Sequence, residues 1–448
     1  MKILLTVHRF FPQYSAGTGV LTCSVARELI RRGHQVHVFT GHPGSADLHE
    51  GDRFDEYEFE SIHVYRFHHA YTPMAGQTSM VEIEYDNQLA GKHFERILEK
   101  FKPDLVHFFH LNRLGTGLVE YAVRAGIPAF MTPTDFWVIC PTGQLVLGNG
   151  KLCSGPSTYA GNCTKHLAES TKKGWVGRVA QWLPTVSVDL LVRLTQAEVM
   201  PPYPYRIEMK AIGSRLPKNI ARLNQLSKII SPNSFMTEKL VQHGVLPHLV
   251  VQSAFGIDVC GQQIKVPRQS PRQPFRVGFI GTLAPHKGCH ILIEAFKALP
   301  HGWAVLKVYG DMEYLPAYSD KLLRLADKSD AIEFYGTFHN SKIGEVLADL
   351  DVLVVPSLWY ENTPLVVYSA QAAHCPVVAS DFPGISEVIK DQVNGLLYEA
   401  GNSARLAKQL SRLINEPDLV GRLSDNSQQP KSTALYVDEM LGIWGGHE

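Results

Sequence analysis

The sequence has no excess of charge of either sign and no long hydrophobic run. Its 448 residues include 43 lysines and arginines against 43 aspartates and glutamates. A net charge near zero gives no argument for nucleic acid as a partner, so any attraction to phosphates or to a membrane must be local. No stretch of about 18 apolar residues occurs, and we therefore expect no membrane-spanning helix.

Signals for secretion and for disulfide bonding are equally scarce. The apolar run Lys2–Val7 is too short for a signal peptide, and no small-residue cleavage site follows it. Seven cysteines are an odd number for a chain of this length. This number favours reduced thiols over a disulfide framework, so we expect a cytoplasmic protein.

The composition is that of a folded protein with more than one domain. Hydrophobic residues make up 45% and charged residues 19% of a chain that is too long for one ordinary core. The first half alternates helical spacing, as in Leu21–Ile30, with expected strands at Lys2–Val7, Gln35–Thr40, Leu105–Phe109, Ala129–Thr132 and Lys228–Ser231. This alternation predicts a parallel, doubly wound sheet.

The same alternation restarts after a polar segment with three prolines, Pro267–Pro274, which we interpret as a linker. The predicted domains are therefore residues 1–268 and 269–425, with a final helix in 426–448 that returns to the first domain. Strands are expected at Arg276–Ile280, Ala304–Tyr309, Ile332–Tyr335, Asp351–Val355 and Pro376–Ala379. Two doubly wound sheets in tandem predict an active site in a cleft between the domains.

Two segments of the second half have features suited to phosphate. In Pro356–Ser369, Thr363 is expected to cap a helix whose first residue is Pro364, and the free N–H groups of such a helix suit a diphosphate. Glu361 precedes that cap, where its carboxylate can accept hydrogen bonds from sugar hydroxyls. An ordinary helix cap beside a solvent-facing glutamate would give the same pattern.

The second segment, Phe279–Gly288, combines a strand, a glycine turn and the pair Lys287-Gly288 before a helix. A lysine in that place can neutralise phosphate as a point charge, although an ordinary surface lysine is the alternative. The segment is neither a P-loop nor a dinucleotide fingerprint, because the spacings G-x-x-x-x-G-K-[ST] and G-x-G-x-x-G are absent.

Together these motifs resemble the family-four retaining glycosyltransferases of GT-B fold, over nearly the whole chain. At the N-terminal side the matching residues are Phe11-Pro12, Gly17, Ala26-Arg27 and Gly33–Val36, and Phe255–Asp258 is similar to the family's N-G-[IV]-D turn. In the second half the family's order is followed by GTLAPHKG at 281–288, WYENTP at 359–364, Val377–Asp381, Gly384–Glu387 and Asn394–Leu397. Each match is weak alone, but five in order at family-like spacing are specific.

The resemblance implies roles for individual residues. Lys287 would hold the donor diphosphate, Glu361 would contact the transferred sugar, and Gly17, in a glycine turn, would let the backbone approach the donor closely. The donor-binding set implied by the motifs also includes Gly281, Thr282, Asn362, Thr363, Pro364, Leu365 and Ser369.

Two positions depart from the family pattern. Relatives usually have a second glutamate eight residues after Glu361, thought to hold the ribose hydroxyls, and this chain has Ser369 there. Relatives also commonly have an arginine where this chain has Thr282. A serine lacks the bidentate acceptor geometry of a carboxylate, so donor affinity and nucleotide preference are open.

The acceptor side is expected at the carboxyl ends of strands in the first domain. Asp135 and Thr134 follow one expected strand and His110 follows another. Relatives often have a histidine at the position of Thr134, which makes Asp135 the stronger catalytic candidate. Local hydrogen bonding in a loop is the alternative for both Asp135 and His110.

Residues 144–204 break the alternation and are interpreted as an insertion on the first domain. In and beside it, Cys140, Cys153, Cys163 and His166 have the spacing C-x12-C-x9-C-x2-H. Three thiolates and an imidazole can form a closed structural zinc site, and scattered buried cysteines are the alternative.

The insertion also contains an amphipathic segment. Trp175, Val179 and Trp182 fall on one helical face near Lys172, Lys173 and Arg178, with Pro184 limiting the first helical piece. Tryptophan beside basic residues suits an anionic membrane surface, and a helix packed on its own domain is the alternative.

The sequence therefore predicts an enzyme that moves a sugar from a nucleotide-sugar donor to a glycan or lipid-linked acceptor. We expect retention of configuration, no cofactor for catalysis, and a cytoplasmic location at the inner face of the membrane, in polysaccharide or glycoconjugate synthesis. Two alternatives remain. One is a nucleotide-sugar epimerase on the same fold, and the other is a catalytically weak protein that binds glycans or partner proteins, for which Ser369 and Thr282 are the best evidence.

Overall fold

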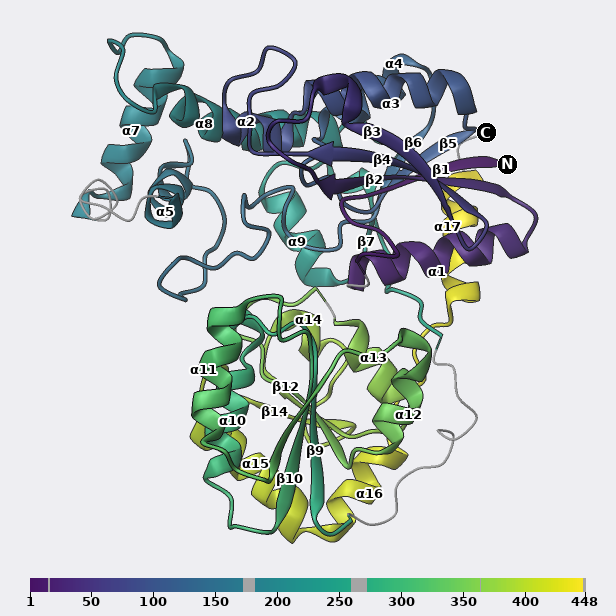
Figure 1. The fold of residues 1–448 in the computed structure, drawn as a ribbon, viewed down its shortest axis with the longest axis vertical. Helices are drawn as coiled ribbons and strands as arrows, with labels where there is room; N and C mark the ends of the chain where they lie inside the picture. The colour runs from purple at the N-terminus through teal and green to yellow at the C-terminus, as the bar shows by residue number, and fades with distance from the viewer. Residues whose placement is uncertain (15–16, 172–181, 259–271, 363, 446–448) are drawn as a thin grey trace. The chain divides into compact units, whose positions relative to one another are not determined.

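The computed structural model describes residues 1–14, 17–171, 182–258, 272–362 and 364–445 (Figure 1). The chain divides into two compact units, of which the first is Met1–Ala254 with Val437–Glu448 and the second is Phe255–Tyr436. The sequence-based boundary was placed instead after residue 268. No helix among the described residues is long and apolar enough to cross a membrane.

The first unit is built on an eight-stranded sheet in the order β3-β4-β2-β1-β5-β6-β7-β8. Its strands are β1 (Lys2–Val7), β2 (Gln35–Pro43), β3 (Phe54–Phe59), β4 (Ile62–His69), β5 (Leu105–Phe108), β6 (Ala129–Met131), β7 (Lys228–Ser231) and β8 (Val250–Gln252). All neighbouring pairs are parallel except β3 with β4. The predicted parallel α/β sheet is thus confirmed, with an antiparallel hairpin added at one edge.

Nothing in the sequence pattern indicated that hairpin. Its two-residue turn, Glu60-Ser61, has φ values of 49° and 65°, which tight hairpins require and which glycine or asparagine usually provides. Because neither residue is a typical choice for this conformation, the turn gave no signal in the sequence.

The helices of the first unit follow its strands or form the insertion. They are α1 (Gly17–Arg31), α2 (Met80–Tyr85), α3 (Gln88–Phe101), α4 (Gly117–Arg124), α5 (Gly161–Thr171), α7 (Thr185–Gln196), α8 (Arg206–Leu223) and α9 (Ser234–Gln242). The C-terminal helix α17 (Thr433–Gly445) begins in the second unit and ends in the first. There Asp438 pairs with Arg32 at 2.5 Å, and the buried Trp444 lies 5.5 Å from the His107 ring, between ring centroids.

The second unit is built on six parallel strands in the order β11-β10-β9-β12-β13-β14. They are β9 (Phe275–Ile280), β10 (Ala304–Tyr309), β11 (Ile332–Gly336), β12 (Val352–Val355), β13 (Val377–Ser380) and β14 (Gly395–Tyr398). Its helices are α10 (Cys289–Lys297), α11 (Pro316–Ala326), α12 (Ile343–Ala348), α13 (Leu365–Ala372), α14 (Pro383–Ser386), α15 (Ser403–Asn415) and α16 (Pro417–Asp425).

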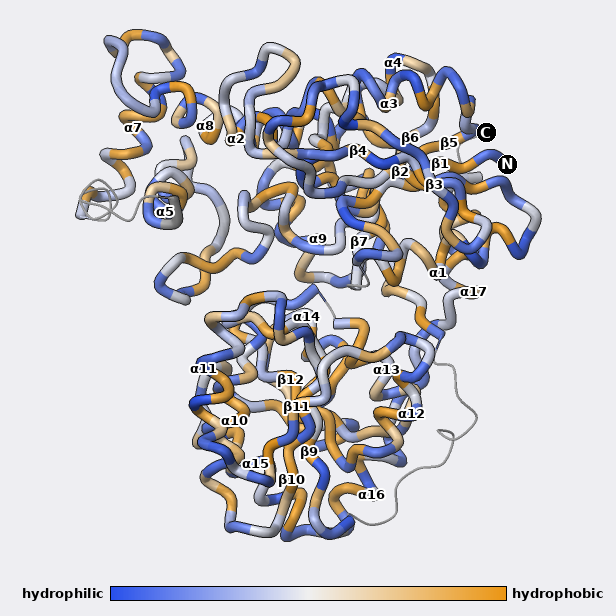
Figure 2. The backbone as a smooth tube through the Cα atoms, in the orientation of Figure 1, coloured by the Kyte–Doolittle hydropathy of each residue, from blue (hydrophilic) through white to orange (hydrophobic). Residues whose placement is uncertain are grey.

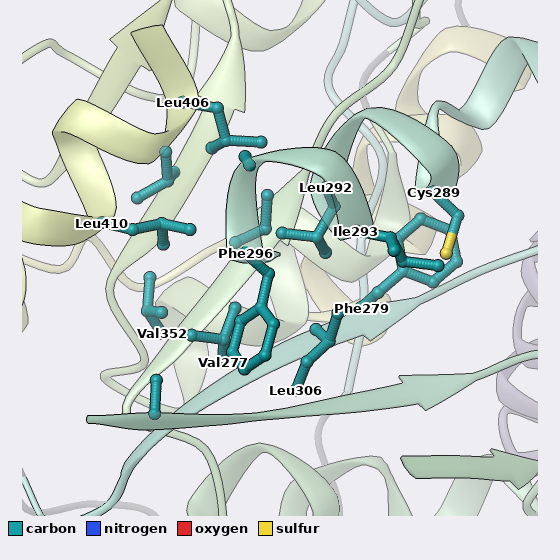
Figure 3. Close-up of a cluster of buried hydrophobic side chains, with 14 of the residues drawn as sticks. Val277, Phe279, Cys289, Leu292, Ile293, Phe296, Leu306, Val352, Leu406 and Leu410 are labelled. Atoms are coloured by element: carbon teal, nitrogen blue, oxygen red, sulfur yellow. The ribbon is translucent and has the colours of Figure 1, made fainter. Parts of the chain in front are cut away.

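The core of the second unit explains why its strands read as continuous apolar runs. Strand β12 is hydrophobic along its whole length (Figure 2) and entirely buried, as expected for a parallel strand covered on both faces. On one face, Val277 and Leu306 of the sheet pack with Leu292 and Phe296 of α10 (Figure 3). This packing holds α10 against the face of the sheet at β9 and β10.

The insertion contains more helix than strand. Residues 140–160 form turns with one isolated bridge, Val146 to Leu152, and α5 and α7 follow. Trp175 and Val179, with the basic residues 172, 173 and 178, lie outside the described residues, whereas Trp182 is described and is 88% exposed. Pro184 stands at the N-cap of α7.

Candidate functional site

In the first unit, three neighbouring strands end in polar side chains at the same edge of the sheet. His8 follows β1, His110 comes just after β5, and Asp135 comes after β6. Strand β1 lies between β2 and β5, so this edge is the point where the strand order reverses, which is where doubly wound sheets bind ligands. The sequence identified His110 and Asp135 but missed His8, because nothing in its local pattern separates it from a loop residue.

The His110 ring is fixed by hydrogen bonds on both nitrogens. Its Nδ1 accepts the Asn112 N–H at 3.1 Å, so Nε2 carries the proton and donates to Asp135 Oδ2 at 2.9 Å. The His8 ring packs on it with 4.0 Å between centroids. Burial, then the charges of His110 and Arg9, lower the pKa of His8 well below its usual value, so His8 is neutral at pH 7.

Asp135 is held in place but remains accessible. Its Oδ1 accepts the Trp137 N–H at 2.7 Å, and its side chain is 29% exposed. Gly143, with φ of 74°, backs the carboxylate so closely that a Cβ there would lie 3.0 Å from Oδ2. Asp135 is thus oriented by its neighbours while keeping the capacity to accept a hydrogen bond from a ligand.

Helix α8 anchors the loop that follows Asp135. The buried Arg215 donates to the carbonyls of Trp137 and Ile139, and Asn219 donates to the Val138 carbonyl at 2.9 Å. Three successive carbonyls are therefore tied to one helix.

The acceptor-side candidate Thr134 and the donor-side candidate Gly17 are both associated with the start of α1. Thr134 Oγ1 accepts from Thr18 Oγ1 at 3.0 Å, which links the loop after β6 to the first turn of α1. Gly17 is the first residue of that helix, so the prediction that it sits in a glycine turn is wrong. Its helical position places it among the free N–H groups of a helix N-terminus instead.

In the second unit, Gly288 brings the lysine segment against the end of β12. Gly288 has φ of 72° and caps the short helix Pro285–Lys287, and a Cβ at this position would lie 1.8 Å from the Pro356 carbonyl oxygen. Only glycine fits, because any side chain would push the two segments apart. The Leu358 N–H donates to the His286 carbonyl at 2.8 Å and joins the same two segments.

This contact brings Lys287 and Glu361 together. Lys287 Nζ donates to Glu361 Oε1 at 2.7 Å, and the same oxygen accepts from Ser357 Oγ at 2.5 Å and Trp359 Nε1 at 2.7 Å. The Lys287 ammonium also lies 4.9 Å from the centre of the Trp359 ring. The Glu361 side chain is only 5% exposed, so its charge depends on these donors.

Beside the pair, the His286 ring makes an edge contact with Trp359 at 5.1 Å between centroids. Burial, and next the Lys287 charge, lower the pKa of His286 to about 4. The His286 ring is therefore neutral at pH 7 and adds no second positive charge beside Lys287. Sequence reasoning assigned no role to Ser357, Trp359 or His286, although Trp359 lies inside the motif that was identified.

Helix α13 begins one residue later than predicted. Its first residue is Leu365 and Pro364 is the N-cap, with ψ of 129°, so Pro364 is not the first helical residue. The fixed φ of proline is compatible with the N-cap position as well as with the first helical position. Here the Pro364 carbonyl accepts the Val367 N–H at 2.9 Å. Thr363, the expected cap, lies outside the described residues, and Asn362 before it is buried.

Further along α13, Ser369 is nearly buried and donates its hydroxyl to the Leu365 carbonyl at 3.1 Å. Gln371, near the end of α13, donates to the Asn394 carbonyl at 3.2 Å and accepts from the Asn394 side-chain amide at 3.1 Å. The asparagine of the motif Asn394–Leu397 thus positions α13 from within the core.

The glycine segment after β9 is ordered by the neighbouring strand. The Gly281 N–H donates to the Tyr309 carbonyl at 3.0 Å, and the Thr282 carbonyl accepts from the Ala284 N–H at 2.9 Å. Gly281 and Thr282 are both half-buried at the carboxyl end of β9. They therefore lie at the sheet edge from which the Lys287 segment starts.

The predicted zinc ligands border one small cavity. It has a volume of about 40 Å³, and its lining includes Cys140, Cys153, Cys163 and His166. Among the described residues, however, no group of three or more His, Cys, Asp or Glu side chains is placed as the ligands of a metal ion. The closed zinc site is therefore not formed by the side chains as they stand.

Both halves of the chain match known protein families. Residues 262–429 match the glycosyl transferases group 1, and residues 15–144 match Glycosyltransferase Family 4. The amylovoran biosynthesis glycosyltransferase AmsK of Erwinia amylovora is 28% identical over 214 residues, which are 45% of this chain and 52% of AmsK. The D-inositol 3-phosphate glycosyltransferase of Mycolicibacterium smegmatis is 32% identical over 172 residues, 38% of this chain and 39% of that enzyme.

The matched segments thus span about half, or less, of these relatives. Solved structures resemble the whole chain in fold. Anabaena HepE in complex with UDP-glucose has a TM-score of 0.62 at 17% identity, covering 99% of each chain. Sucrose-phosphate synthase from Thermosynechococcus elongatus has a TM-score of 0.64 at 16% identity, covering 100% of each chain. With its two parallel-sheet units and these matches, the chain belongs to the group 1 glycosyltransferases and has their GT-B fold.

Proposed function

We propose that this glycosyltransferase moves a sugar from a nucleotide-sugar donor to a hydroxyl of a glycan or lipid-linked acceptor, with retention of the anomeric configuration. The observation that carries the proposal is the contact between Lys287 and Glu361 at the carboxyl ends of β9 and β12. A cation beside a buried acidic acceptor suits a ligand that is anionic at one end and rich in hydroxyl groups at the other.

The donor would replace part of this contact network. We propose that Lys287 turns from Glu361 toward the diphosphate, and that the first N–H groups of α13 bind the same phosphates. Glu361, released from its lysine partner, would accept a hydrogen bond from a hydroxyl of the transferred sugar. The complex of HepE with UDP-glucose makes a uridine nucleotide the first donor to try.

Catalysis in this proposal is mainly electrostatic. The bond between the anomeric carbon and the diphosphate breaks, and the acceptor oxygen bonds to that carbon from the same face. Lys287 and the α13 N–H groups stabilise the charge that develops on the departing diphosphate. Because these groups supply the charge stabilisation, we expect the transfer step to need no cofactor.

On the acceptor side, Asp135 is the residue proposed to receive the acceptor hydroxyl. Its remaining lone pairs are accessible, and its orientation is set by His110 and by the Trp137 N–H. Thr134 would complete the acceptor contacts, and His110, whose two ring nitrogens are already bonded, would act on the acceptor through Asp135. The name of AmsK, a glycosyltransferase of amylovoran biosynthesis, favours an acceptor in polysaccharide or glycoconjugate synthesis.

We further propose that the insertion touches an anionic membrane surface from the cytoplasmic side. Val186 and Leu190 share one face of α7 and are 78% and 53% exposed, and Trp182 just before the helix is 88% exposed. Exposed apolar side chains of this kind mark interaction surfaces. Two lysines and an arginine, at positions 172, 173 and 178, are near these residues in the sequence, and basic side chains suit an anionic surface. The cytoplasmic side is proposed because all six described cysteines are free thiols, which a reducing compartment favours.

A donor screen followed by a transfer assay tests the proposed reaction. Nucleoside diphosphates and nucleotide sugars are first compared by thermal shift, since a ligand in excess over its Kd stabilises the folded protein. The best donor is then incubated with glycan and lipid-linked acceptors, and proton NMR of the product reports the anomeric configuration. An inverted product would contradict retention, and an epimerised nucleotide sugar formed without acceptor would favour the epimerase instead.

A further inference from the structure

The insertion contains a cluster of soft metal ligands that the proposed transfer reaction does not use. Cys140, Cys153, Cys163 and His166 border one cavity of about 40 Å³. The rest of its lining is largely apolar, including Val146, Leu147 and Leu167, with a few polar side chains among them. Three thiols and an imidazole gathered on one small space are the ligand types that select zinc among the common divalent cations.

Polar contacts hold the Cys153 sulfur at the edge of the cavity. Its Sγ accepts from the Gly155 N–H at 3.5 Å and from the Asn162 side-chain amide at 3.7 Å, and the thiol donates to the Gly155 carbonyl at 3.5 Å. These bonds fix the position of the sulfur within the turn. Gly155 has φ of 121°, a conformation reserved for glycine, so the turn that aims this N–H at the sulfur is specified by the sequence.

The three thiols are also electrostatic neighbours. Burial, and next the charges of Cys140 and Cys153, raise the pKa of Cys163 to about 12. Burial also raises the pKa of Cys153 and lowers the pKa of His166. The influence of Cys140 and Cys153 on Cys163 agrees with the cavity that the three thiols share.

The segment has little else to hold it. Residues 140–160 form turns that two polar side chains tie to neighbouring helices. Asn162 of α5 accepts from the Ser157 N–H at 2.8 Å and donates to the Gly155 carbonyl at 2.8 Å, and Asp189 of α7 accepts from the Tyr159 N–H at 3.1 Å. A loop-rich segment without a core of its own gains much of its stability when a metal closes it. Cys140 also comes directly after the three carbonyls that α8 holds, so this segment continues into the loop of Asp135.

We propose that Cys140, Cys153, Cys163 and His166 bind one structural Zn²⁺, which pins the segment from residue 140 to residue 166 and thereby the loop that carries Asp135. Since the side chains as they stand do not surround a single point, they must turn about their Cα–Cβ bonds into the cavity they border. The three thiols release their protons to solvent as the metal binds. The inference concerns metal binding and does not depend on the proposed transfer reaction.

Elemental analysis of the full-length protein tests this site directly. Protein prepared with zinc and dialysed should carry about one equivalent, and Cys153→Ser and His166→Ala should each lose most of it. Cys375→Ser is the matched control, because Cys375 is a buried thiol in the second unit, and it should keep its zinc. Wild-type protein without zinc, or variants that retain a full equivalent, would overturn the proposal.

Cobalt substitution and proteolysis keep the test decisive if a variant fails to fold. Wild-type protein loaded with Co²⁺ should show thiolate-to-cobalt charge transfer and the strong visible absorption of a tetrahedral site. Removing the metal from folded wild-type protein should open new protease cleavage within residues 141–160. Absence of the charge-transfer band, a disulfide in place of the metal, or cleavage unchanged by chelation would contradict it.

Discussion

Replacing Lys287 with alanine removes the cation that pairs with Glu361 in the described part of the chain. The ammonium donates to a carboxylate oxygen at 2.7 Å, and the two side chains are 24% and 5% exposed. Because the lysine is about a quarter exposed, the ion pair stabilises the fold less than a fully buried pair, and we expect a loss of about 1–2 kcal/mol. Ser357 and Trp359 continue to satisfy Glu361 Oε1, which limits the damage.

The effect on transfer should be larger than the effect on stability. Losing one preorganised group that stabilises the departing diphosphate costs about tenfold to a thousandfold in turnover. The assay is kcat and kcat/KM for the selected donor, beside calorimetric affinity for its nucleoside diphosphate, which should also weaken. Lys297→Ala is the matched control, since Lys297 is the last residue of α10, the helix that follows the Lys287 segment, and bonds to the Leu325 carbonyl at 3.1 Å. Folded Lys287→Ala with wild-type kinetics would refute the donor site.

Three further predictions concern Ser369, the buried His107 and the exposed side chains at the start of α7. Ser369→Glu restores the carboxylate that relatives have at this position. A charged hydrogen bond is worth about 1.5–3 kcal/mol, so calorimetry should show nucleoside diphosphate binding that is up to about 10- to 100-fold tighter. Loss of binding would contradict the alignment. Burial lowers the pKa of His107 to about 3 from 6.5, so the unfolded chain takes up its proton first as pH falls below 6.5. The unfolding free energy from urea titrations should therefore fall by about 2 kcal/mol for this group between pH 7.5 and pH 5, and a flat profile would be inconsistent with a buried neutral ring. The double variant Trp182→Ser, Val186→Ser should co-sediment less with anionic vesicles than wild type, and added salt should weaken the binding of wild type. The control Leu323→Ser, at another exposed leucine, should sediment as wild type does. Equal sedimentation of the double variant and wild type would argue against membrane contact.

Most strands with one buried apolar run were predictable to within a residue or two, whereas β2 continues three residues beyond the predicted Gln35–Thr40. Lys2–Val7, Lys228–Ser231 and Ala304–Tyr309 have the predicted bounds, because parallel strands covered on both faces leave a continuous hydrophobic signal. The hairpin β3–β4 and the short strands β8 and β14 were missed, since the turn at Glu60-Ser61 has no typical turn residue and β8 and β14 have only three and four residues.

Site residues that belong to a sequence motif were predictable, whereas contacts that form only when distant segments fold together were not. Lys287 and Glu361 were both named from their motifs, but their direct contact depends on Gly288 packing against Pro356, 68 residues away in the sequence. His8 joins His110 only because β1 and β5 are neighbours in the sheet, and this neighbourhood has no sequence signal. Tertiary contacts of this kind cannot be predicted from local sequence patterns.

The most direct measurement of the central claim compares Glu361→Gln with wild type in two assays, the rate of sugar transfer and the affinity for the nucleoside diphosphate. The diphosphate lacks the sugar that Glu361 is proposed to contact, so its affinity should change by less than about threefold, while loss of a charged hydrogen bond should slow transfer by about 10- to 100-fold. Transfer at the wild-type rate, or equal losses in transfer and in diphosphate affinity, would contradict the assignment of Glu361 to the donor sugar.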